Sequence, residues 1–85
     1  MKFDVYADPG HAWCKVPLQL INKLGIAEEI TSCSYVRGDK VYLEEDCDLA
    51  TFVQAMNERG VDVEFRIHHT DRSSKIRGYA IYDGA

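Results

Sequence analysis

The fold is decided by the stretch YVRGDKVYL, residues 35–43, in which two runs rich in β-branched and aromatic residues flank a Gly-Asp pair. Such runs are typical of strands, and a two-residue loop containing glycine matches the twist of paired strands. We therefore expect a β-hairpin between Thr31 and Glu45 that turns at Gly38 and Asp39.

The register of this hairpin predicts which residues share a face. A loop of two residues pairs Val36 with Val41 and Tyr35 with Tyr42. Because successive side chains of a strand point to opposite faces, Val36, Val41 and Leu43 form the expected core face, and the two tyrosines lie opposite it.

A helix follows the hairpin, because apolar residues recur there at the i, i+3, i+4 and i+7 spacing of one helical face. They are Leu49, Phe52, Val53 and Met56. Asp46 or Asp48 is the expected cap, and Gly60 ends the helix. Residues 61–67 then alternate apolar and polar side chains, which predicts a half-buried strand with Val61, Val63, Phe65 and Ile67 inward.

Upstream, residues 2–6 and 12–16 predict a first hairpin around Asp8-Pro9-Gly10, and residues 17–24 a short helix. The predicted order is β-β-α-β-β-α-β. We expect one α+β domain, residues 1–85, with an antiparallel sheet of four to six strands and both helices on one face. A ferredoxin-like core is embedded if the first arm is peripheral. Residues 70–85 form either a final strand or a flexible, peripheral segment.

Composition limits the classes of protein. The chain has 85 residues, a net charge of −4 and 46% hydrophobic residues, which fits one small folded domain and not a disordered chain. No apolar stretch approaches the ~20 residues of a membrane span, and the acidic start does not resemble a signal peptide. We therefore expect a cytoplasmic protein without a membrane partner.

Residues that could carry chemistry are few. Cys14, Cys33 and Cys47 have neither disulfide-framework nor zinc-motif spacing, so we interpret them as reduced structural thiols. His68 and His69 point to opposite faces of a strand and cannot chelate a metal together. The sequence predicts no catalytic residue, no metal site and no cofactor, and a protein that is not an enzyme.

The predicted partner-binding surface combines the two tyrosines with an acidic run. Its residues are Tyr35, Tyr42, Glu44, Glu45, Asp46 and Asp48. The carboxyl-terminal segment is an alternative cover for the tyrosines, and the acidic run is equally compatible with a solvated helix entry.

The last part of the chain is basic, because residues 65–85 carry four Lys or Arg against two acidic residues. This segment supports an alternative function, in which a nucleic-acid-associated accessory or regulatory protein contacts phosphates. The residues for that function are Arg66, Arg72, Lys75 and Arg77.

Three stretches are similar to a known family: YADPGHAWCKVP at residues 6–17, SYVRGDKVYLEEDCD at 34–48 and SKIR at 74–77. With the LGI at 24–26, they resemble a family of small uncharacterised proteins encoded by bacteriophages and other bacterial mobile elements. The resemblance implies a cytoplasmic binder that inhibits a host defence complex, with an anti-CRISPR role as its sharpest form. It supplies no catalytic residues. A homodimer through an open sheet edge is also compatible with so short a chain.

Overall fold

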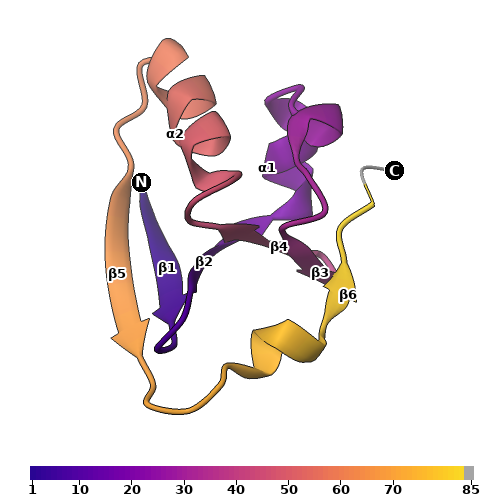
Figure 1. Cartoon of the computed structure of the whole chain (residues 1–85). Coiled ribbons are helices and arrows are strands. Elements are labelled where there is room, and N and C mark those ends of the chain that lie inside the picture. Colours follow the sequence, from indigo (N-terminus) through magenta and orange to yellow (C-terminus); the bar gives the residue numbers. More distant parts are fainter. Residues whose placement is uncertain (84–85) are drawn as a thin grey trace.

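The computed structural model describes residues 1–83 and shows a curved six-stranded sheet with two α-helices on one side (Figure 1). In chain order the elements are β1 (Lys2–Ala7), β2 (Ala12–Pro17), α1 (Leu18–Lys23), η1 (Ala27–Glu29), β3 (Tyr35–Arg37), β4 (Lys40–Glu44), α2 (Leu49–Glu58), β5 (Glu64–His69), η2 (Lys75–Gly78) and β6 (Ala80–Ile81). The α+β class and the predicted order of strands and helices are thus confirmed. Within residues 1–83, no helix is both long and apolar enough to span a membrane.

The strand order is β5-β1-β2-β4-β3-β6. All neighbours are antiparallel except β1 and β5, which run parallel from Lys2 opposite Glu64 to Ala7 opposite His69. The sheet is therefore mixed, and the prediction of a wholly antiparallel sheet was wrong. The first strand of the amino-terminal hairpin is not peripheral either, because β1 lies between β2 and β5. A ferredoxin-like core would instead pair β2 and β5 directly.

The central hairpin has the predicted register, with Tyr35 opposite Tyr42 and Val36 opposite Val41. Gly38 has a φ of 58° and no other residue of this loop has a positive φ. That combination places the glycine at the first central position of a type II′ turn, which a residue with a Cβ would occupy at a cost.

The main core lies between the sheet and the helices. Val16, Val41 and Leu43 from the sheet face meet Ile21 of α1 and Phe52 of α2, and all five are fully buried. The ring of Phe52 also contacts Phe3 edge-on, with centroids 5.1 Å apart. The apolar faces predicted for the hairpin and for α2 therefore meet in one core.

The β5 strand departs from the prediction. It begins at Glu64, and all six of its residues are exposed, including Phe65 and Ile67. Both apolar side chains lie on the helix side, because they are paired with Phe3 and Val5. The strand is an edge, however, and the ten-residue α2, about 15 Å long, packs over Phe3 and leaves the edge uncovered. The prediction of a half-buried strand was therefore wrong for Phe65 and Ile67, whereas Val61 and Val63, which precede the strand, are partly buried against the main core as predicted.

The segment after β5, residues 70–79, which we name the strap, crosses the sheet on the side opposite the helices (Figure 1). It joins β5 at one edge of the sheet to β6 at the other and contains η2. Beyond β6, Tyr82 enters the main core and donates a hydrogen bond to the Ala27 carbonyl. The described part of the carboxyl-terminal segment thus includes a short final strand, and residues 84–85 lie outside the described residues.

Candidate functional site

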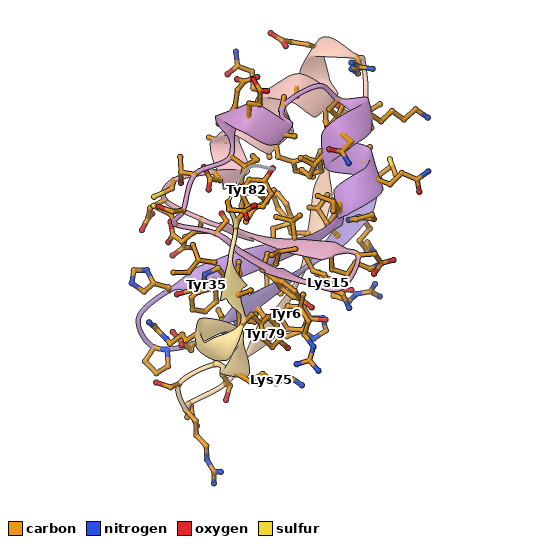
Figure 2. All side chains as sticks on the ribbon, turned by 90° about the vertical axis from the view of Figure 1, so that its right-hand side faces the viewer. Tyr6, Lys15, Tyr35, Lys75, Tyr79 and Tyr82 are labelled. Carbon is orange, nitrogen blue, oxygen red and sulfur yellow. The ribbon has the colours of Figure 1, made fainter. Side chains whose placement is uncertain are left out.

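A second, aromatic cluster fills the space between the sheet and the strap. Trp13, Tyr42 and Ile76 are buried there, and Tyr6, Tyr35 and Tyr79 are packed against them. Figure 2 shows Tyr35 and Tyr79 below the sheet, whereas Tyr82 lies above it on the helix side. The strap therefore covers the tyrosine pair that we predicted as a contact surface, which decides between the two alternatives left open by the sequence.

An ion pair fastens the strap to the turn between β1 and β2. Arg77 donates from Nε and Nη2 to the two carboxylate oxygens of Asp8, at 2.7 and 2.9 Å. The backbone N–H groups of Ser74, Gly10 and His11 donate to the same carboxylate. These donors, Arg77 foremost, hold the pKa of Asp8 well below its usual range.

The acidic run divides into buried and exposed residues. Glu44 and Asp48 are buried, whereas Glu45 and Asp46 are exposed. Tyr42 is buried as well, so three of the six residues predicted for partner binding are buried. The physical reason is that the strap covers one sheet face and the loop before β3 encloses Asp48. The carboxylate of Glu44 is held by His11 and by the Asp46 N–H.

Asp48 is the most enclosed carboxylate. It stands at the N-cap position of α2, as predicted, but its side chain makes no capping bond. It accepts hydrogen bonds from the N–H and hydroxyl of Thr31 and from the hydroxyl of Ser34. Ser34 in turn accepts from the Glu44 N–H at 3.0 Å. This Asp48 network fixes the loop before β3 against the end of β4.

That loop brings together two cysteines that are far apart in sequence. Cys33 and Cys47 are both exposed, and their Sγ atoms are 2.7 Å apart. The hydrogen bond to Cys33, partial burial and the nearby Glu44 raise the pKa of the Cys47 thiol to about 12. Cys14 is buried in the main core, and burial raises its pKa to about 12 as well. The sequence missed the Cys33–Cys47 pair, because its 14-residue separation matches no motif.

The cysteine pair opens onto a cavity of about 310 Å³. Its lining includes His11, whose Nδ1 is 3.2 Å from Glu44 Oε1. Asp46 is nearby, and one ligand atom of each of these three residues lies within 4.8 Å of the others. Trp13 also lines this cavity, and its Nε1 has no hydrogen-bond partner among residues 1–83. The sequence did not predict this cluster of ligand-type residues, and the expectation of no metal site stays a prediction.

The four basic residues predicted for nucleic-acid contact do not form one free surface. Arg66 is bonded to Asp4 at 2.7 Å, and Arg77 is held by Asp8. Arg72 and Lys75 are exposed on the strap and its η2 turn. The bonds from His68 and Arg66 lower the pKa of Asp4.

A second set of cavities lies along the strap. Lys75 and Lys15 line one of about 170 Å³ together with Tyr6 and Tyr79, all labelled in Figure 2. Arg72 and Lys75 line another of about 340 Å³ with His68 and His69. The basic groups left free by the ion pairs thus gather around aromatic rings.

Comparison of the chain with protein-family models, with curated proteins and with solved structures finds no match.

Proposed function

We propose that this chain is a stoichiometric binding protein of a bacteriophage or other mobile element, which inhibits a host defence complex, in its sharpest form as an anti-CRISPR protein. The observation that supports the proposal is the open β5 edge. Half of the residues of the predicted tyrosine and acidic surface are buried, so the contact surface is reassigned to this strand.

The β5 edge offers apolar side chains beside unpaired backbone. Phe65 is 39% exposed, Ile67 57% and the neighbouring Met1 62%. Edge strands that are long, exposed and apolar are templates for pairing with another strand, and natural proteins usually protect them. The strand β6 at the other edge has only two residues.

The backbone direction of β5 follows from its bonds to β1. Glu64 N–H donates to the Met1 carbonyl and Thr70 N–H to the Ala7 carbonyl. In a parallel ladder, alternate residues give both backbone groups to the same neighbour. The N–H and C=O groups of Phe65, Ile67 and His69 therefore point outward. The occupant that fits is an extended segment of a host protein with apolar side chains at alternate positions.

The test compares Ile67→Glu with a matched control, Ile81→Glu, which places the same charge at a 60% exposed isoleucine on the opposite edge. Tagged versions of both and of the parent chain are incubated with nuclease-treated lysate of a host that carries defence systems. We expect one host protein to be retained in equimolar amount by the parent and by Ile81→Glu and lost with Ile67→Glu. Inhibition of that host complex must likewise be retained by the parent chain and by Ile81→Glu and lost with Ile67→Glu.

Two results would refute the proposal. Equal retention by Ile67→Glu and the parent would remove β5 as the contact surface. A second copy of the chain as the bound species, measured by light scattering as a dimer that Ile67→Glu dissociates, would make β5 a self-association edge instead.

A second candidate function is nucleic-acid association, which the cavity lined by Lys15, Lys75, Tyr6 and Tyr79 favours. Cationic groups beside aromatic rings bind the phosphates and bases of single strands. We expect binding that weakens steeply with salt and falls with Lys75→Glu, measured by fluorescence anisotropy with single-stranded DNA and RNA. Titrations that show no binding at low salt would eliminate this function.

A further inference from the structure

We propose that the chain binds a zinc ion in the cavity beside the start of β2 and the end of β4, with Cys33, Cys47, His11 and Glu44 as ligands. This inference is independent of the function proposed for β5. It goes against the expectation of structural thiols and no metal.

The four groups all line the 310 Å³ cavity, and they form two close pairs. Cys33 Sγ is 2.7 Å from Cys47 Sγ, and the backbone N–H of Cys47 donates to the Glu44 carbonyl at 3.3 Å, which keeps the cysteine pair next to Glu44 in the fold. Glu44 Oε1 is 3.2 Å from His11 Nδ1. In each pair a divalent cation can replace the proton between the two groups when it binds.

The donor set suits zinc. Two thiolate sulfurs, one imidazole nitrogen and one carboxylate oxygen are all common ligands of tetrahedral Zn²⁺. For bonds of the usual length, neighbouring nitrogen and oxygen ligands are ~3.3 Å apart and two sulfurs ~3.8 Å apart. The His11–Glu44 distance already matches. The sulfurs must separate by ~1 Å and must also approach the His11–Glu44 pair, because they lie outside the 4.8 Å group that this pair forms with Asp46. Both sulfurs are carried by exposed side chains, which can rotate.

The surrounding structure fixes the backbone of each ligand. Glu44 is 6% exposed, and its second oxygen accepts the Asp46 N–H at 2.8 Å. The Asp48 network anchors the loop that carries Cys33. The N–H of His11 is bound by the Asp8 carboxylate at 2.9 Å. The ligands thus come from segments that are already in place, which lowers the entropy lost on binding.

Two neighbouring charges bear on the choice of ion. Arg77 lines the same cavity, but its guanidinium is compensated by two bonds to Asp8. Asp46 would complete a site of His11, Glu44 and Asp46 for a harder cation that does not use the thiols. Zinc binding releases the two thiol protons to solvent, so the two alternatives differ in proton release and in their response to cysteine substitution.

The experiment uses the full chain, reduced with a phosphine and freed of metal. Zinc affinity is measured by competition with a chromophoric chelator, and Co²⁺ is added separately as a spectroscopic probe. We expect one zinc per chain and, with Co²⁺, the intense visible bands of a tetrahedral site with a near-ultraviolet thiolate band. Cys33→Ser, Cys47→Ser and His11→Gln should each weaken zinc binding about tenfold or more. Glu45→Gln, an exposed neighbour, should leave it unchanged.

Three outcomes would overturn the proposal. The first is that the reduced chain fails to bind zinc at equimolar concentration. The second is that the Cys47→Ser variant binds zinc as tightly as the parent chain. The third is that Co²⁺ gives only the weak spectrum of a six-coordinate site. Circular dichroism spectra of each variant serve as the control that the variant is folded. The exposed positions of both cysteines make loss of folding an unexpected result.

Discussion

Replacing Asp48 by Ala should destabilise the chain by about 2–4 kcal/mol, because this carboxylate holds the loop before β3. Hydrogen bonds to a charged group contribute roughly 1.5–3 kcal/mol each. The Ser34 hydroxyl is fully buried and loses its only acceptor in the network, so its bond counts in full. Thr31 is exposed, and water replaces most of what its two donors lose.

The measurement is urea unfolding followed by circular dichroism, with the free energy extrapolated to water. The matched control is Glu45→Ala, an exposed acid three residues earlier, for which we expect a change within about 0.5 kcal/mol. Asp48→Asn keeps the shape and one acceptor oxygen, and should fall between the two. If Asp48→Ala costs no more than Glu45→Ala, the Asp48 network does not hold the loop, and the argument that it places Cys33 beside Cys47 fails.

Three further predictions concern the turn, the strap and acid. Gly38→Ala should cost about 1–2 kcal/mol because of its positive φ, whereas Gly78→Ala, with ordinary φ and open space, should be near neutral in the same urea assay. Ile76→Ala should cost about 3 kcal/mol and shift the emission of Trp13, the single tryptophan, to longer wavelength as the aromatic cluster is exposed. The pKa of Asp8 is lower in the folded chain than its ordinary value of 3.8, so the unfolded chain binds more protons in acid. The stability contributed by this carboxylate is therefore complete at neutral pH and lost as pH falls below about 4, and Asp8→Asn should flatten that part of the melting-temperature curve.

Local signals in the sequence were sufficient for the central hairpin and for α2. The Gly-Asp loop permits one register, and a slip by one residue would turn Val36, Val41 and Leu43 to the wrong face. In α2, Phe52 and Met56 lie one turn apart and both are buried, as their spacing predicts. These elements were predictable because each carries its own apolar face.

Long-range placement was not predictable in the same way. The alternation in β5 resembles that of any half-buried strand, and only the position of α2 over Phe3 leaves Phe65 and Ile67 exposed. The strap has no periodic pattern of apolar residues. It is held in place by one buried isoleucine, Ile76, and by the ion pair between Arg77 and Asp8. Neither interaction has a signature in linear sequence.

The sequence did not predict the candidate metal ligands either, because they come from separate segments of the chain that only the fold brings together. One of these ligands is linked to the strap through the backbone. The turn between β1 and β2 carries Asp8, which binds Arg77 of the strap, and His11, the proposed zinc ligand, three residues later. The Asp8 carboxylate also accepts the His11 N–H, so one rigid turn bears both contacts. A metal that fixes His11 must then favour the conformation in which Asp8 holds the strap, and the strap must favour the metal by the same factor. The proposed zinc site and the aromatic cluster are accordingly connected through this turn. In β5, His68 stacks on Tyr6 of the aromatic cluster, whereas Phe65 and Ile67 lie on the helix side of the sheet and can be altered without touching that cluster.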